Sequence, residues 1–124
     1  MSCCSEKMEA LNTESCCTPH ETVQKASLAM RTTGCGCSPV VKDKESRMVV
    51  GVVTERDVCQ KVVADDRKAS ETAVEGIMSP ASACCGKDDS LDEVRRKLHE
   101  HKATSLPVVD KGGSCCGTIS VHHC

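Results

Sequence analysis

Most of this sequence consists of one unit repeated twice. Residues 16–41 align with residues 84–109 at a constant offset, and beyond this stretch the offset shortens by two residues, so that Gly51 falls on Gly117. The shortening lies where a turn is expected, which predicts a longer hairpin in the first copy and a shorter one in the second. A repeat of this kind indicates two copies of one structural unit. Each copy is too short to fold alone, so we expect a shared core.

The hydrophobic pattern predicts the same order of elements in both copies, namely strand, helix, strand, hairpin, strand and helix. In the first copy, Thr22 is expected to cap a helix that buries Val23, Ala26 and Met30 and ends at Gly34. The other elements expected in this copy are strands at 16–17, 37–41 and 48–53, a helix at 54–64 that buries Val58, Cys59, Val62 and Val63, and a charged connector at 65–72. Together these elements predict an α+β fold.

The second copy follows the same plan after a single helical turn within residues 73–80. Its helix is opened by the capping box Ser90-Leu91-Asp92-Glu93. Its strands are expected at 84–85, 106–109 and 115–119. The sequence then stops where the last helix of this copy is expected to begin.

The junction between strand 48–53 and the helix that follows it is the best candidate site. Thr54 stands at the helix N-terminus and Asp57 three residues later. A hydroxyl and a carboxylate at this spacing form a helix cap, in which Thr54 accepts a hydrogen bond from the amide of Asp57. The same junction can hold a phosphate on its amides and ribose hydroxyls on its carboxylate. Spacing alone favours capping, whereas the recurrence of the junction in the second copy favours a ligand site.

The composition excludes several classes of function. The chain has no aromatic residue and a net charge of −2, so it lacks stacking platforms and a basic surface for nucleic acid. No apolar run approaches the roughly 20 residues that span a bilayer, and the N-terminal glutamates are unlike a presequence. We therefore expect a cytoplasmic protein that binds neither nucleic acid nor membrane. Because few residues are large aliphatics, we also expect marginal stability.

The chain has 12 cysteines. This is a large number for a protein of a reducing compartment such as the cytosol, where we expect the chain to be. Two adjacent pairs, Cys16-Cys17 and Cys84-Cys85, occupy equivalent positions of the repeat. They either fill strand positions as small hydrophobes or bring thiols together as a soft-metal site or redox-switched bridge. Because neighbouring strand residues point to opposite faces, each pair offers only one thiol to such a site. A further cluster that could take up adventitious Zn²⁺ or Cu⁺ is formed by Cys115, Cys116, His122, His123 and Cys124.

Both copies carry P-V-V at their centre, and the first ends in G-h-h-T-x-x-D, where h is apolar. This arrangement resembles a tandem pair of CBS domains, also called a Bateman module. The stretches that carry the resemblance are Gly51-Val52-Val53-Thr54-Glu55-Arg56-Asp57-Val58, Gly76-Ile77-Met78-Ser79-Pro80 and Leu106-Pro107-Val108-Val109-Asp110. The resemblance implies two three-stranded sheets packed about a pseudo-twofold axis, with helices outside and the second repeat truncated at its last helix. We divide the chain into a flexible leader at 1–15, the first repeat at 16–72 and the second at 73–124.

The resemblance also implies a ligand, an adenine nucleotide such as AMP or ATP or a related adenosyl compound, bound between the repeats. Thr54 matches the family's phosphate or ribose contact, and Asp57 matches the carboxylate that takes the ribose hydroxyls. In the second copy Ser120 keeps the hydroxyl, but His123 stands where the aspartate is expected, which predicts one competent and one degenerate site. The residues implied to contact the ligand are Thr54, Arg56, Asp57, Cys17, Ser38, Pro39, Val40 and Ser120.

These features predict a regulatory module that controls a partner protein and is not an enzyme. No nucleophile with a base and no glycine-rich phosphate loop is evident, and neither a resident cofactor nor a metal-ligand set is assigned. A homodimer is expected, because cysteine in place of branched aliphatics thins the core and makes further burial valuable. Two alternatives stay open: a thiol-rich metal-binding or redox-sensing module, and a degenerate CBS dimerisation scaffold without a ligand.

Overall fold

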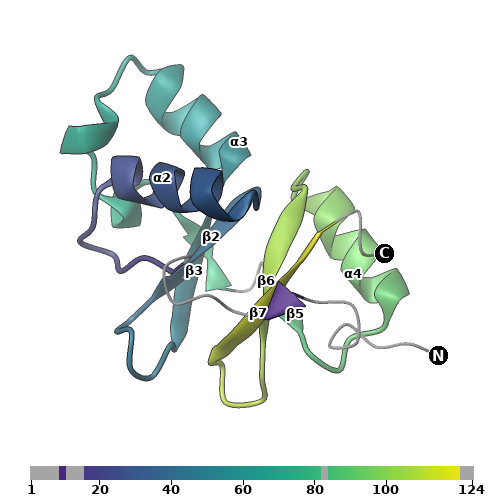
Figure 1. Ribbon diagram of the computed structural model, residues 1–124. Helices are drawn as coiled ribbons and strands as arrows, with labels where there is room; N and C mark the ends of the chain where they lie inside the picture. Colours follow the sequence, from purple (N-terminus) through teal and green to yellow (C-terminus); the bar gives the residue numbers. More distant parts are fainter. Residues whose placement is uncertain (1–8, 11–15, 82–83, 121–124) are drawn as a thin grey trace.

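The computed structural model describes residues 9–10, 16–81 and 84–120. It has the predicted mixed α+β fold, in which two sheets lie side by side and the helices cover their outer sides (Figure 1). In chain order, the elements are β1 (Glu9–Ala10), α2 (Val23–Thr33), β2 (Cys37–Val41), β3 (Val49–Thr54), α3 (Glu55–Val58), the π-helical turn η2 (Cys59–Val63), the 3₁₀ turns η3 (Ala69–Glu71) and η4 (Val74–Gly76), β4 (Ser79–Pro80), β5 (Cys85–Gly86), α4 (Leu91–Glu100), β6 (Ser105–Val109) and β7 (Cys115–Ser120).

Each sheet receives a short strand from the segment that leads into the other repeat. The first sheet has the order β2-β3-β4 and the second the order β1-β7-β6-β5. In the first, Pro80 of β4 pairs with Gly51, and in the second, Ala10 of β1 pairs with Gly117, the counterpart of Gly51. The second sheet therefore has four strands where the resemblance implies three.

Two sequence expectations are corrected by these short strands. The flexible leader expected at 1–15 is wrong at Glu9–Ala10, which pair with β7. Ser79–Pro80, expected at the end of a helical turn, form an edge strand, a position that tolerates proline because one side of the strand needs no partner. The expected strand at 16–17 is a single bridge from Cys17 to Val40, running parallel like its counterpart β5 on β6.

Helix α2 has the predicted start, face and end. The Thr22 hydroxyl caps it, and Val23, Ala26 and Met30 are buried. Gly34 ends the helix in the left-handed conformation, with φ of 73°, and donates its N–H to the carbonyl of Met30. The local signals in the sequence were sufficient here because cap, stripe and glycine all act within one helix.

The predicted capping box of α4 is only half formed. The Ser90 hydroxyl accepts from the Glu93 amide at 3.2 Å, as expected. The Glu93 carboxylate instead pairs with Arg96 at 2.7 Å, one turn along the helix. The helix still buries Val94 and Leu98 against the second sheet.

The helix predicted at 54–64 changes type after one turn. α3 ends at Val58, and the π turn η2 begins at Cys59. Because a π turn has more residues per turn than an α-helix, the side chains that follow point in other directions than a continuous α-helix would give them. As a result Val62 is buried, but Cys59 and Val63 are exposed, Val63 to 66%. The prediction that these residues share a buried face is therefore wrong for Cys59 and Val63.

The two repeats meet through backbone hydrogen bonds that obey the repeat symmetry. Met48 pairs with Ser114, its own counterpart, in an isolated antiparallel bridge. The Val49 amide donates to the Gly113 carbonyl at 3.0 Å, and the Cys115 amide donates to the carbonyl of Arg47 at 2.8 Å. Because Val49 corresponds to Cys115 and Arg47 to Gly113, these two bonds exchange places under a twofold rotation. The pseudo-twofold axis implied by the resemblance is thus present.

The core is divided in the same symmetric way. One buried cluster lies under α2 and includes Cys17, and a second lies under α4 and includes Cys85. A third cluster lies between the repeats and combines three counterpart pairs: Cys16 with Cys84, Val41 with Val109, and Val49 with Cys115. As predicted from strand alternation, only one cysteine of each adjacent pair reaches this shared cluster.

At two equivalent positions, both repeats have a residue with positive φ, in the left-handed backbone conformation. The side chains at these positions differ between the repeats. At the hairpin turn, Arg47 has φ of 55° and its counterpart Gly113 has φ of 87°. After the first helix of each repeat, Gly34 has φ of 73° and its counterpart Lys102 has φ of 50°. At each position one repeat uses glycine, which adopts this conformation freely, and the other uses a charged residue, which is strained there.

This asymmetry predicts opposite effects of two substitutions at the same turn. Gly113→Ala should destabilise the fold by about 1–2 kcal/mol, because the new Cβ is strained at positive φ. It would also lie 3.0 Å from the Met48 sulfur. Arg47→Gly should be neutral or stabilising by up to about 1 kcal/mol, since it relieves the same strain. Urea unfolding followed by circular dichroism measures both, and equal losses in the two variants would contradict the explanation.

Candidate functional site

Thr54 and Asp57 form a complete reciprocal cap at the junction of β3 and α3. The Thr54 hydroxyl accepts from the Asp57 amide at 3.1 Å, and Asp57 Oδ2 accepts from the Thr54 amide at 3.0 Å. Both residues are buried. The capping interpretation of this spacing is therefore confirmed. The same cap fixes the carboxylate at the N-terminus of α3, where the helix dipole stabilises negative charge.

Two residues that the sequence interpretation missed complete the surroundings of this carboxylate. Lys61 places its ammonium 3.1 Å from Asp57 Oδ1 and also donates to the Ile77 carbonyl at 2.9 Å. The Ser79 hydroxyl donates to both carboxylate oxygens at 3.3 Å. Lys61 could have been found, because it lies four residues after Asp57 on a predicted helix. Ser79 could not, because it arrives through the pairing of β4 with β3.

The residues implied to line an adenine pocket also lie together, at the start of the first repeat. Cys17 donates its amide to the Pro39 carbonyl at 2.9 Å and bridges to Val40. The Ser38 hydroxyl donates to the Cys17 sulfur at 3.5 Å. All four side chains are buried. They are joined to the candidate site through β2 and β3, where Ser38 pairs with Val53.

The remaining predicted residues lie at more open positions. Arg56 is exposed on α3, next to the cap. Ser120 ends β7 and is half-buried opposite Ser105, as its counterpart Thr54 ends β3 opposite Cys37. His123, on which the degenerate second site was predicted, lies outside the described residues.

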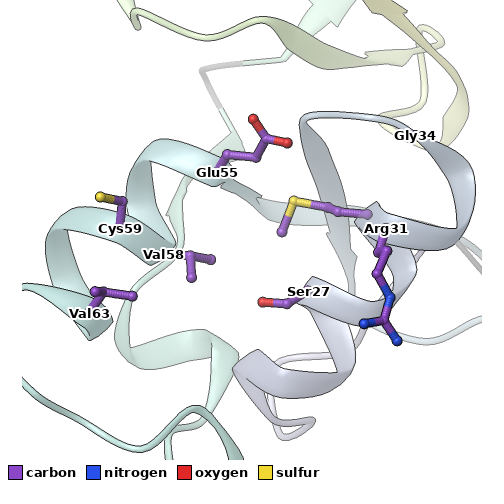
Figure 2. A pocket seen from close by; sticks show the side chains of 8 residues that line it. Ser27, Arg31, Gly34, Glu55, Val58, Cys59 and Val63 are labelled. Atoms are coloured by element: carbon purple, nitrogen blue, oxygen red, sulfur yellow. The ribbon is translucent and has the colours of Figure 1, made fainter.

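A groove of about 480 Å³ opens between α2 and the helical segment α3–η2 (Figure 2). Figure 2 shows Ser27 and Val58 on opposite walls of this groove. It is lined by Ser27, Met30, Arg31, Gly34, Glu55, Val58, Cys59 and Val63. Neither Thr54 nor Asp57 lines it, so this groove is separate from the predicted nucleotide cleft. The π turn η2 contributes the exposed Val63 and Cys59 to its lining.

The fold and the junction together define the class of protein. Two α+β repeats share one core about a pseudo-twofold axis, and equivalent strands of the two end in a hydroxyl residue, Thr54 in β3 and Ser120 in β7. The family model of the CBS domain matches residues 9–64 and 74–124. The chain therefore belongs to the CBS domain family, as a tandem pair of repeats.

Comparison with known proteins agrees with this assignment. A homoserine O-acetyltransferase of Methanosphaera stadtmanae is 32% identical over 85 residues, which are 68% of this chain and 16% of that protein. A CBS domain protein of Pyrobaculum aerophilum, solved as a complex with AMP, has a TM-score of 0.82 at 18% identity, covering 98% of this chain and 89% of the other. Hypoxic Response Protein I, solved with two coordinated zinc ions, has a TM-score of 0.80 at 21% identity, covering 98% and 95%.

Burial keeps the thiols of the inner cysteines protonated. It raises the pKa of Cys17 to about 11 and the pKa values of Cys37 and Cys84 to about 12, from an ordinary value of 9.0. Burial also raises the pKa of Cys116. For Cys115, a hydrogen bond with the Cys16 thiol, together with burial, raises the pKa. These thiols therefore behave as small hydrophobes at neutral pH, one of the two interpretations left open by the sequence.

The described residues hold neither a cluster of metal ligands nor a membrane span. Within 9–10, 16–81 and 84–120, no group of three or more His, Cys, Asp or Glu side chains is placed to hold a metal ion. The tail cluster proposed from the sequence includes His122, His123 and Cys124, which lie outside this part of the chain. None of the described helices is both long and apolar enough to cross a bilayer.

The cap at Asp57 predicts a specific loss of stability. Asp57→Ala should destabilise the protein by about 1–3 kcal/mol, because it leaves the Thr54 amide and the Ser79 hydroxyl without their acceptor. Asp57→Asn keeps an acceptor oxygen and should lose less. Asp92→Ala, which removes an exposed carboxylate from the first turn of α4, is the matched control and should change stability by about 0.5 kcal/mol or less. Urea unfolding measures all three, and an equal loss at Asp92 would contradict the role of the cap.

The buried thiols predict that stability falls at alkaline pH. The folded protein holds their protons to higher pH than the unfolded chain, so their contribution is complete below about pH 9 and is lost as the pH rises. Above about pH 9, each buried thiol should lower the free energy of unfolding by about 1.4 kcal/mol per pH unit, up to the pH at which that thiol ionises in the folded protein. Urea unfolding in reductant at about pH 8 and pH 10 measures the slope. Cys37→Ala should make the loss of unfolding free energy with pH less steep, because it removes one buried thiol. Replacing the exposed Cys59 by Ser should leave the slope unchanged. The reverse result would show that the buried thiols do not cause the loss.

Proposed function

We propose that this CBS pair is a regulatory module that binds an adenine nucleotide at the β3–α3 junction and controls a partner protein. The observation that carries the proposal is the Asp57 carboxylate, buried, oriented by Thr54 and placed at a helix N-terminus. A carboxylate fixed in this way can accept hydrogen bonds from both hydroxyls of a ribose. The AMP complex of the structurally similar Pyrobaculum aerophilum protein supports this choice of ligand.

The surroundings of Asp57 indicate how the ligand would bind and be sensed. Ribose hydroxyls would replace Ser79 on the carboxylate, since both are neutral hydroxyl donors. Lys61, whose side chain is half-exposed and whose ammonium lies beside Asp57, would then face the nucleotide phosphate. Because Ser79 belongs to β4, which leads into the second repeat, its displacement would transmit ligand occupancy from one repeat to the other.

Calorimetry on reduced, chelator-treated protein tests this proposal with AMP and ATP. We expect saturable binding near one nucleotide per chain, and at least about tenfold weaker binding in Asp57→Asn, because a charged acceptor is lost. Ser120→Ala, which removes the hydroxyl at the end of the equivalent strand of the second repeat, should leave the affinity nearly unchanged. Circular dichroism establishes that each variant is folded. A folded protein with no binding heat for either nucleotide, or weakening by Ser120→Ala alone, would overturn the assignment.

The regulated partner and the homodimer also belong to this proposal. A second copy would cover the groove between α2 and α3–η2, whose rim carries the exposed Val63. Light scattering on the calorimetry sample measures the molar mass, and a monomer at all concentrations would remove the homodimer from the proposal.

A further inference from the structure

Three cysteines from separate segments meet in the cluster that joins the two repeats. Cys16 precedes α2, Cys84 precedes β5, and Cys115 begins β7. Their residue exposures are 4%, 5% and 1%. They share this cluster with Val41 and Val49. The surface that holds the repeats together is thus lined with oxidisable groups, and the proposed nucleotide site uses none of them.

Within this cluster, Cys16 and Cys115 are in direct contact. Their thiols share a hydrogen bond, although one belongs to the first repeat and the other to the last strand of the second. Cys84 is near enough to act on Cys115 electrostatically, but it makes no such bond with it among the interactions described for Cys115. Cys16 and Cys115 are not symmetric partners, because the repeat matches Cys16 with Cys84. Their contact arises because the second repeat has cysteine where the first has Val49.

We propose that Cys16 and Cys115 form a reversible disulfide that locks the two repeats together when the protein meets an oxidised low-molecular-weight thiol. The bond would cross the pseudo-twofold axis beside the backbone hydrogen bonds at Val49 and Gly113. It would join residues 99 positions apart in the sequence. A link over so long a loop restricts the unfolded chain strongly.

The chemistry is a thiol–disulfide exchange with glutathione disulfide as the oxidant. One protein thiol loses its proton, and the thiolate attacks glutathione disulfide, breaking its S–S bond and releasing one glutathione thiol. The second protein thiol, also deprotonated, attacks the mixed disulfide, forms the Cys16–Cys115 bond and releases the second glutathione thiol. The protein loses two protons and two electrons, and glutathione disulfide gains both.

The burial of these residues decides when the exchange occurs. Attack requires a thiolate, and the Cys115 thiol keeps its proton because burial and the bond to Cys16 raise its pKa. Both residues are buried while the repeats are closed. Oxidation therefore follows opening of the interface, and once the bond has formed, the interface cannot open again until it is reduced.

Peptide mapping under non-reducing conditions tests the proposal on the full chain. Accessible thiols are first alkylated on the native reduced protein, and the protein is then treated with glutathione disulfide with and without a low concentration of urea. Trypsin places the three cluster cysteines in separate peptides, which are residues 8–25, 69–87 and 112–124. We expect a linked pair of 8–25 with 112–124, formed several-fold faster in urea because urea opens the interface.

Variants assign the cysteine that forms the bond within peptide 112–124. Cys115→Val, which installs the residue that the first repeat has at this position, should abolish the linked pair while leaving the circular dichroism spectrum native. Cys116→Ser changes the neighbouring, half-buried cysteine in the same peptide and should leave the linked pair intact. In the oxidised protein, the urea midpoint should rise by at least about 1 M, and dithiothreitol should reverse this shift.

Three results would overturn the proposal. A link between 8–25 and 69–87 would place the bond between the symmetric pairs Cys16-Cys17 and Cys84-Cys85 instead. Persistence of the 8–25 to 112–124 link in Cys115→Val would assign it to another cysteine of the last peptide. Absence of any link among the three peptides after oxidation in urea would show that the thiols are structural only. No nucleotide is used, so these outcomes are independent of the proposed function.

Discussion

The structure depends on the contact between the two repeats at the pseudo-twofold axis. Two reciprocal backbone hydrogen bonds join the hairpins there, between Val49 and Gly113 and between Cys115 and Arg47. Directly beneath them lies the cluster built from counterpart residues of the two repeats. Because a repeat of this size cannot bury enough surface alone, the axis is what turns two marginal halves into one fold. The nucleotide cleft proposed here and the inferred disulfide both depend on its geometry.

Much of this fold could be predicted from the sequence where the determining forces are local or repeated. The cap and end of α2 follow from Thr22 and Gly34, and the internal repeat predicts the core that the two copies share. The π turn η2 could not be predicted, because a 3.6-residue period places Val63 on the buried face. The partner strands β1 and β4 were also missed, since two-residue strands carry no periodicity and are formed by pairing at a distance.

For the candidate site, the sequence showed the cap but not what surrounds it. The spacing of Thr54 and Asp57 predicts their mutual hydrogen bonds, which depend only on one helical turn. Ser79, which donates to the same carboxylate, is brought there by β4 and has no local signal in the sequence. The cap and the proposed ribose contact use the same carboxylate, so the two original interpretations of this motif are compatible. A residue that holds a helix end in place is also pre-oriented for a ligand.

The exchange of short strands between the repeats bears on the order in which the chain folds during synthesis. The first sheet gains its third strand only after Pro80 has been made, and the β1 strand waits for β7, more than 100 residues later. The first repeat therefore leaves the ribosome with an unpaired edge at β3, and β1 stays unpaired until β7 has been made. Contacts of such long sequence separation slow folding and leave edges open to other chains meanwhile. The first sheet can therefore close before the second, because β4 is synthesised before β7.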